Sequence, residues 1–309
     1  MGRIPVFYRP ETVASVASFS PSAGKPAAVV ADWSGAGLPI ELQFFEPLSP
    51  RDLNRVHAPD FVDGVLAGRV SNGFGNRDAR VATACLYTTG AMAAAAEEAV
   101  RNGRVAVAPV SGFHHAGRDF CGGYCTFNGL MAAASLLREA GLAQRVGILD
   151  LDQHFGNGTE DIIKALNAKW VRHYTAGRFG FAPRDAESFL SDLPDIVAAF
   201  ADCDVLLYQA GADPHIADPL GGWMNTAQLL KRDSIVFRGA RRLNLPVAWN
   251  LAGGYQRDAD GGIAPVLAIH RNTMKACAAA FRSDPQQSEA HAPKRGTSEQ
   301  HQSTQKGPR

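Results

Sequence analysis

The chain has 309 residues, of which 46% are hydrophobic and 20% charged, so it holds enough apolar material for a substantial buried core. Its net charge of +1 gives no electrostatic basis for binding nucleic acid, and we expect no nucleic-acid partner. There is no run of about twenty apolar residues and no apolar signal-peptide core, so we expect no membrane partner either. Five irregularly spaced cysteines argue against a disulfide framework and favour a reducing, cytoplasmic location.

In chain order, short apolar segments alternate with helical patterns. Strands are predicted where apolar, partly β-branched runs are bounded by Gly, Pro or polar residues, at 104–110, 145–152, 203–210 and 245–252. Helices are predicted at 84–103, 128–141, 159–168, 185–200, 226–243 and 262–282, with Asn128 as a cap and Gly103 and Gly141 as ends. Strands that are apolar on both faces and alternate with helices predict an α/β fold, with a mostly parallel central sheet covered by helices on both faces.

The chain shows no internal repeat and no linker before residue 283. We therefore predict one domain over residues 1–282. Residues 283–309 are polar and nearly without apolar side chains. Such a segment cannot offset its own ordering entropy, so the sequence predicts a disordered tail.

Reactive side chains follow each of the four predicted strands. They are His114 and His115 after the first, Asp150, Asp152 and His154 at the end of the second, Asp213 after the third and Tyr255 after the fourth. The carboxyl ends of parallel strands share one edge of the sheet. We therefore expect these side chains to meet there.

Asp152, His154 and Asp213 would together form a three-ligand nitrogen and oxygen site. Three protein ligands plus water are typical of catalytic zinc, and oxygen-rich ligation also admits Fe²⁺, Co²⁺ or Mn²⁺. A metal there could polarise a carbonyl and bring the pKa of bound water to about 7. A neighbouring imidazole could then take the proton and later deliver it to a leaving amine.

Each of these groups also has a purely structural interpretation. The segment 150–154 could cap a helix, Asp213 could belong to a turn, and Tyr255 could be a packed aromatic. A second enzyme class also remains open, since "ILDLD" resembles the aspartate-nucleophile motif of haloacid-dehalogenase-like phosphatases. That class expects a threonine or valine near His154 and a later acidic motif, for which "RDADGG" at 257–262 is a poor substitute.

Four motifs in this order resemble those of the histone deacetylase superfamily, which includes bacterial acetylpolyamine amidohydrolases. They are "GFHHAGRDFCGGYCTFN", "ILDLDQHFGNGTEDI", "QAGADPHIADPLGG" and "LAGGY". A weaker match at 48–66 resembles the family's N-terminal helical region. The resemblance spans roughly residues 45–280 and implies an arginase/deacetylase-type α/β domain.

The resemblance also implies roles for individual residues. The zinc ligands would be Asp152, His154 and Asp213, and a monovalent cation such as K⁺ would lie near Asp150, Asp152 and His154. His114 would lie beside the attacking water and pair with Asp150. His115 would be the main general base and acid and pair with Asn157. Tyr255 would stabilise the oxyanion.

Substrate contacts are implied as well. Gly123 and Tyr124 would line the acyl tunnel, Phe179 or Phe181 would form its opposite wall, and Leu220 would lie at the rim. The family's acidic rim residue has no secure match, and the loop 69–81 offers Asn72, Asn76 or Asp78.

We therefore predict a zinc-dependent amidohydrolase that removes an acyl group, most simply acetyl, from an amine such as acyl-lysine. One rival is a deacetylase of acetylpolyamines or other small molecules. A rival of another class is a non-catalytic ligand-binding module on the same fold. The expected partner is the acylated amine substrate, and assembly into a homo-oligomer remains open. Asn157 replaces the aspartate of several family members, so the pKa of His115 should be lower here than in those members.

Overall fold

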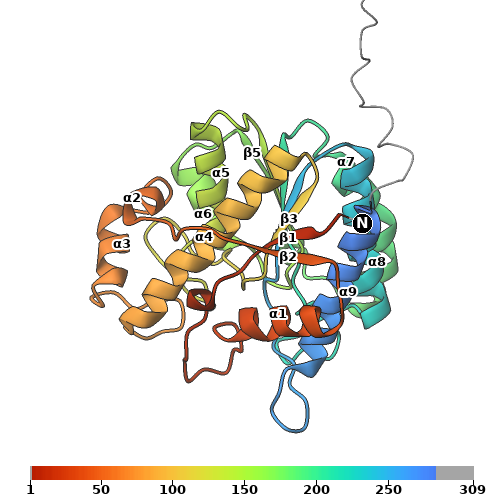
Figure 1. Cartoon of the computed structure of the whole chain (residues 1–309), viewed down its shortest axis with the longest axis horizontal. Coiled ribbons are helices and arrows are strands. Elements are labelled where there is room, and N and C mark those ends of the chain that lie inside the picture. Colours follow the sequence, from red (N-terminus) through yellow and green to blue (C-terminus); the bar gives the residue numbers. More distant parts are fainter. Residues whose placement is uncertain (1, 283–309) are drawn as a thin grey trace, which may run out of the picture.

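The computed structural model describes residues 2–282, so the predicted tail at 283–309 lies outside the described residues. Seven strands form one sheet in the order β2-β1-β3-β7-β6-β4-β5, and every neighbouring pair is parallel. The neighbouring strands β1, β2 and β3 lie close together near the centre of the view in Figure 1. The strands are β1 (Ile4–Phe7), β2 (Ile40–Gln43), β3 (Val105–Ala108), β4 (Val146–Asp150), β5 (Val171–Thr175), β6 (Val205–Gln209) and β7 (Val247–Asn250).

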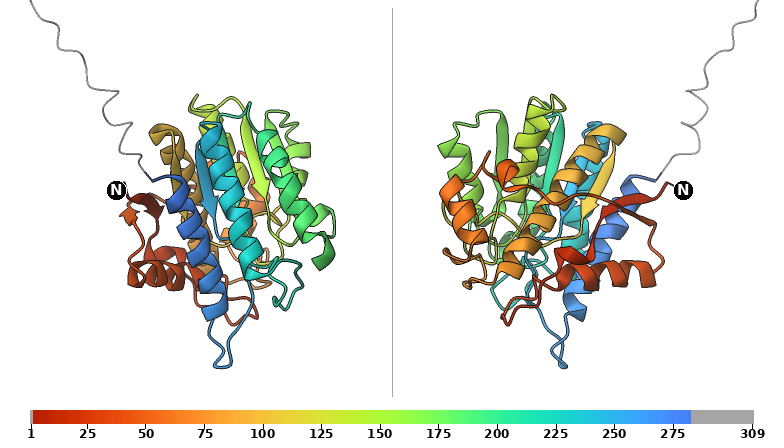
Figure 2. Two further views of the ribbon diagram at one scale, coloured as in Figure 1. Left: turned by 90° about the vertical axis from the view of Figure 1, so that its right-hand side faces the viewer. Right: turned by 60° about the vertical axis from the view of Figure 1, so that its left-hand side comes forward.

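Helices cover both faces of this sheet (Figure 2). On one face lie α1 (Lys25–Gly35), α7 (Ala186–Ala198), α8 (Thr226–Arg242) and α9 (Ala264–Ala280). On the other lie α2 (Pro50–Leu53), α3 (Pro59–Leu66), α4 (Ala79–Asn102), α5 (Gly129–Glu139) and α6 (Asn157–Ala165). Short 3-10 turns lie at Pro10–Thr12, Ala176–Arg178 and Pro183–Asp185. The predicted α/β class with a parallel sheet between two helical layers is confirmed.

The alternation along β3 shows why the core has two halves. Val105 and Val107 belong to the apolar cluster beneath α1, α7, α8 and α9, whereas Ala106 and Ala108 belong to the cluster beneath α2 to α6. Successive residues of a strand point to opposite faces, so a strand with helices on both sides must be apolar at every position. This is why the sequence predicted this strand.

The four predicted strands correspond to β3, β7, β6 and β4, which are consecutive strands in the middle of the sheet. The sequence pattern missed β1, β2 and β5, which lie toward the edges of the sheet. At an edge, one or both faces of a strand reach solvent. In β2 Leu42 is 54% exposed, and β5 carries Arg172 and His173, so neither strand shows a continuous apolar run.

The N-terminus of α4 lies five residues before the predicted start at 84. Asp78 caps this helix, because its side chain accepts a hydrogen bond from the backbone N–H of Arg80. The predicted ends are confirmed: Gly103 terminates α4 with a positive φ of 63°, and Asn128 caps α5 by accepting from Met131 N–H. Helix α1 was not predicted at all.

Because all strands run in parallel, the loops after them gather at one edge of the sheet. Asp150, Gln209 and Asn250 are the last residues of β4, β6 and β7, and they form one row across these neighbouring strands. The residues that follow this row build the site. Across residues 2–282, the structure contains no helix that is both long and apolar enough to span a membrane.

Candidate active site

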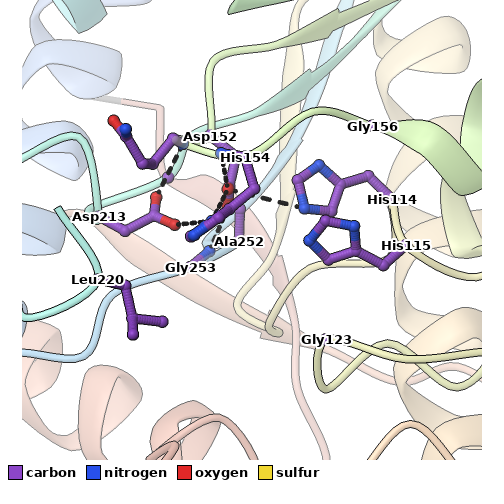
Figure 3. A network of polar contacts seen from close by, with 12 residues as sticks. His114, His115, Gly123, Asp152, His154, Gly156, Asp213, Leu220, Ala252 and Gly253 are labelled. Atoms are coloured by element: carbon purple, nitrogen blue, oxygen red, sulfur yellow. Dashed lines mark hydrogen bonds and ion pairs between the residues drawn. The ribbon is translucent and has the colours of Figure 1, made fainter. Parts of the chain in front are cut away.

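Asp152, His154 and Asp213 converge just beyond the carboxyl edge of the sheet (Figure 3). Asp152 and His154 follow β4 and Asp213 follows β6, so two neighbouring strands deliver them. His154 Nδ1 lies 3.1 Å from Asp152 Oδ1 and 3.0 Å from Asp213 Oδ2. One potential ligand atom from each residue lies within 4.8 Å of the other two, which is compatible with all three binding one ion.

Two glycines leave room for these carboxylates. A Cβ at Gly253 would lie 2.2 Å from Asp213 Oδ2, and one at Gly211 would lie 2.6 Å from Asp213 Oδ1. Gly253 N–H also donates to Asp152 Oδ2 at 2.8 Å. The backbone therefore approaches both carboxylates more closely than any residue with a side chain would allow.

The electrostatics of the cluster favour a bound cation. Burial, and then the neighbouring Asp152 carboxylate, raise the pKa of Asp213 to about 7. Hydrogen bonds to Asp152 and Asp213 raise the pKa of His154 to about 10. Both shifts reflect the energetic cost of placing two carboxylates together in a buried site. Two carboxylates and one imidazole are a donor set that suits a divalent transition metal, so the residues present fit such an ion.

Two adjacent histidines lie beside this cluster, with ring centroids 4.1 Å apart. His114 is buried, and its Nδ1 lies 2.7 Å from Asp150 Oδ2. His115 Nδ1 lies 2.6 Å from Asn157 Oδ1, at the first position of α6. The structure therefore brings together both residue pairs that the family resemblance implied.

The pKa values of the two imidazoles shift in opposite directions. Burial by itself would lower the pKa of His114, but Asp150 and Asp152 outweigh this penalty and raise it to about 9. The pKa of His115 is lowered to about 4, first by burial and then by the charge of His114. Asn157 accepts a hydrogen bond but carries no charge to offset these effects. These shifts favour the charged form of His114 and the neutral form of His115 at neutral pH.

Tyr255 faces the cluster from the loop after β7. Its ring centroid lies 6.4 Å from that of His154, and its backbone N–H donates to Asp218 Oδ2 at 2.8 Å. Burial, and then the carboxylates of Asp213 and Asp152, raise the pKa of Tyr255 well above its usual range. The hydroxyl therefore stays protonated and can donate a hydrogen bond.

Gly123 and Tyr124 lie against this group. Gly123 has a φ of +52°, and a Cβ there would lie 2.3 Å from His115 Cδ2, so the position requires glycine. The ring centroid of Tyr124 lies 5.8 Å from that of Tyr255. Together with His114 and Asp152 these residues border a small cavity.

The predicted rim residue Leu220 is 41% exposed and lies on the Asp213 side of the site (Figure 3). Its backbone N–H donates to Asp218 Oδ1 at 3.0 Å, and Asp218 Oδ2 accepts from Tyr255 N–H. One buried carboxylate thus connects Leu220 to the loop that carries Tyr255.

The two candidates for the opposite tunnel wall have different surroundings. Phe181 packs against Trp223 and Phe189, with centroid distances of 4.6 and 5.0 Å. Phe179 is 56% exposed and follows a turn whose Gly177 lies directly against the His154 backbone. Phe179 is therefore the better candidate for contact with a substrate, because Phe181 is only partly exposed and packs against the core.

The loop 69–81 places no free acid at the rim. Asp78 caps α4 and forms an ion pair with Arg80 at 2.6 Å. Asn72 is buried, and its side chain donates to Asn76 Oδ1 at 2.7 Å. The side chains that the sequence offered for the acidic rim residue are therefore engaged within their own loop.

The sequence analysis missed three residues near the site. Lys25 is fully buried in α1, and its Nζ donates to Ala252 O at 2.5 Å, three residues before Tyr255. Phe19 stacks on Tyr255 with a centroid distance of 6.2 Å. Gln209 contacts Asp150 through its side chain. A sequence signal existed for Gln209 alone, since it is an amide at the end of an apolar strand.

The parallel sheet carries three carboxylates, three imidazoles and a tyrosine at its carboxyl edge, so the chain is an α/β protein with a candidate metal centre. Comparisons with known proteins show which family the chain resembles. The family profile described as "Histone deacetylase domain" matches residues 31–171. An uncharacterised protein of Picosynechococcus sp. is 27% identical over 254 residues, which cover 74% of this chain and 84% of that protein.

Two further similarities are informative. Acetylpolyamine amidohydrolase 1 of Pseudomonas aeruginosa is 44% identical over 80 residues, which cover 25% of this chain and only 22% of that relative. The crystal structure of acetylpolyamine aminohydrolase from Burkholderia pseudomallei superimposes with a TM-score of 0.70 at 17% identity, covering 90% of this chain and 99% of that chain. This second similarity shows the shared fold.

These similarities support placing the chain in the histone deacetylase superfamily. Its named relatives are deacetylases and amidohydrolases, which are hydrolases acting on amide bonds. The arginase/deacetylase-type fold implied by the sequence motifs is confirmed.

Proposed function

We propose that this protein is a metal-dependent amidohydrolase that removes an acyl group, most simply acetyl, from an amine. The observation that carries the proposal is the convergence of a neutral imidazole, His115, and a protonated phenol, Tyr255, beside the cluster of Asp152, His154 and Asp213. A base, a hydrogen-bond donor and a metal-binding cluster are the groups that amide hydrolysis requires.

Asp152, His154 and Asp213 would hold Zn²⁺, and Fe²⁺ or Co²⁺ would suit the same donors. The ion would supply Lewis-acid polarisation of the amide carbonyl and a lowered pKa for water. We also predict that a monovalent cation binds near Asp150, Asp152 and His154.

His115 is suited to act as the general base. Its pKa near 4 leaves the ring neutral at physiological pH, and Asn157 accepts the Nδ1–H, so the lone pair resides on Nε2. His115 Nε2 would take a proton from the attacking water and return it to the departing amine nitrogen. His114, whose Nδ1 pairs with Asp150, would present its other ring nitrogen to the reacting carbonyl beside the metal cluster.

Tyr255 would donate its hydroxyl proton in a hydrogen bond to the oxygen of the tetrahedral oxyanion. Its high pKa keeps that proton in place throughout the reaction. Gly123 and Tyr124 would line the passage for the substrate, and Phe179 its opposite wall.

The proposed substrate is an acylated amine, either acyl-lysine or a small acylated amine. The names of several relatives favour a small amine such as an acetylpolyamine. The apolar rim residue Leu220 and the engaged Asp78 instead favour an uncharged or peptide-like substrate over a polycation. We keep the cytoplasmic location as a prediction and assembly into a homo-oligomer as an open question.

A screen of acyl-lysine peptides, acylpolyamines and other small amides against purified protein of known metal content tests the proposal. We expect turnover of at least one acylated amine that depends on the metal. If metal-loaded, folded protein binds such compounds but releases no free amine, the non-catalytic binding module becomes the better interpretation.

Asn157→Asp should move the acidic limb of the pH profile to higher pH. The base form of His115 is active, so kcat/KM falls when the pH drops below the pKa of this ring. A carboxylate in place of the amide stabilises the imidazolium and raises that pKa by about one to three units. Activity at pH 5 relative to pH 8 should therefore fall in the variant, as measured by kcat/KM across this range.

Asn244→Asp adds the same charge at an exposed position before β7, at the opposite edge of the sheet, and should leave the profile unchanged. An acidic limb that does not move in Asn157→Asp would contradict the role of His115.

Leu220→Glu should shift substrate preference toward cations. A carboxylate at this half-exposed position would pair with a substrate ammonium group, and such exposed pairs contribute up to about 1 kcal/mol, or about fivefold. We expect the wild type to favour an acetyl-lysine peptide over acetylputrescine, and the variant to raise the kcat/KM ratio toward acetylputrescine.

Leu230→Glu on α8, a leucine of similar exposure, is the matched control and should leave that ratio unchanged. If the wild type already prefers acetylputrescine by tenfold, Leu220 does not determine substrate preference. A small acylated amine then becomes the favoured substrate class.

A further inference from the structure

Gln209 is a fully buried amide to which the proposed mechanism assigns no role. It is the last residue of β6, in register with Asp150 on β4 and Asn250 on β7. All three side chains are fully buried and lie in one row across the carboxyl edge of the sheet. In parallel strands, side chains in register point to the same face.

The two ends of the Gln209 amide have different partners. Nε2 donates to Asp150 Oδ1 at 2.9 Å, and Oε1 accepts from the backbone N–H of Phe113 at 3.3 Å. Phe113 directly precedes His114, whose Nδ1 lies 2.7 Å from Asp150 Oδ2. Gln209, Asp150, His114 and the Phe113 backbone therefore form a closed ring of contacts.

The surroundings leave the amide little freedom. A Cβ at Gly112 would lie 3.3 Å from Gln209 Oε1 and 3.4 Å from Ala252 Cα, so the backbone packs closely against it. A donor must face the carboxylate and an acceptor must face the N–H, so only one orientation of the amide satisfies both. Asn250, the next residue of the row, has no hydrogen-bond partner for either end of its side chain among the residues that the structure describes.

We propose that Gln209 is a positioning residue that fixes the Asp150–His114 pair. It holds Asp150 through Oδ1 and the backbone before His114 through Phe113, so Asp150 Oδ2 is left to receive His114 Nδ1–H. The other ring nitrogen of His114 then faces the candidate metal cluster, where Nε2 lies 3.7 Å from Asp152 Oδ1. The expected effect on turnover rests on the proposed function.

Gln209→Met is the principal test, because methionine fills a similar volume but neither donates nor accepts here. Gln209→Glu is the second variant: it keeps an acceptor for Phe113 N–H and places a second carboxylate against Asp150. The matched control is Asn250→Leu, which removes an equally buried amide from the same row but breaks no hydrogen bond of the described residues.

We expect Gln209→Met to lower kcat by about 10- to 100-fold, the range found for residues that orient the groups around a metal, while KM and metal content stay near wild type. Gln209→Glu should lose at least as much. The ring N–H resonance of His114, assigned by its absence in His114→Ala, should shift or exchange faster in both variants. Asn250→Leu should retain kcat and the resonance.

Wild-type kcat together with an unchanged His114 resonance in Gln209→Met would overturn the proposal. A fall in kcat that is fully explained by loss of metal would also overturn it. The same holds if Asn250→Leu lowers kcat by as much as Gln209→Met. If Gln209→Met does not fold, Gln209→Glu decides by the same readouts. If the metal-loaded wild type hydrolyses no acylamine, the proposed function fails, and the His114 resonance alone decides whether Gln209 positions the ring.

Discussion

Asp213→Ala should lose most of its bound metal. Asp213 supplies one of two carboxylates around His154, and its Oδ2 lies 3.0 Å from His154 Nδ1. Removing residues that merely orient metal ligands costs about 10- to 100-fold in affinity, so removing a ligand should cost more than about 100-fold. Metal analysis after dialysis against a weak chelator should show near-full occupancy in the wild type and little in the variant.

The protein without metal should tolerate this change well. Burial and the neighbouring Asp152 raise the pKa of Asp213, which means that its charge is costly where it stands. The metal-free variant should therefore melt no lower than the metal-free wild type. Asp218→Asn is the matched control: Asp218 is also buried, but it accepts backbone N–H groups from Leu220 and Tyr255, so this variant should keep its metal. Full occupancy in Asp213→Ala would exclude Asp213 as a ligand.

Tyr255→Phe should keep the fold and the metal but lose most of the activity. The substitution removes one hydroxyl and leaves the ring packed between Phe19 and Tyr124. A hydrogen-bond donor to an oxyanion is worth on the order of a hundredfold or more in rate. Because the contact strengthens only as charge develops on the oxygen, the loss should appear in kcat rather than in KM.

The measurement is steady-state kinetics on the best substrate from the screen, at matched metal content. Tyr87→Phe removes an equivalent hydroxyl on α4, outside the site, and should be neutral. Near-normal turnover of Tyr255→Phe would reduce Tyr255 to a packing residue and would leave the oxyanion without its proposed donor.

The central part of the fold could be predicted because local sequence carries it. Strands β3, β4, β6 and β7 are apolar at nearly every position, since helices cover both of their faces. That pattern also predicts the shared carboxyl edge. From there the grouping of Asp152, His154 and Asp213 follows without knowledge of any contact. The two edge strands β2 and β5 gave no such signal, because solvent allows polar residues such as Arg172 within β5.

The sequence by itself determined the fold class, the edge that carries the site and the residue types gathered there. The tertiary structure alone decided which partners these residues have. Lys25 reaches Ala252 across 227 positions, and Gln209 bridges Asp150 and Phe113 from a third strand. Such contacts depend on how closely separate segments approach one another. Periodicity and spacing report which face of an element is buried, but they carry no information about the distance between the elements that meet there.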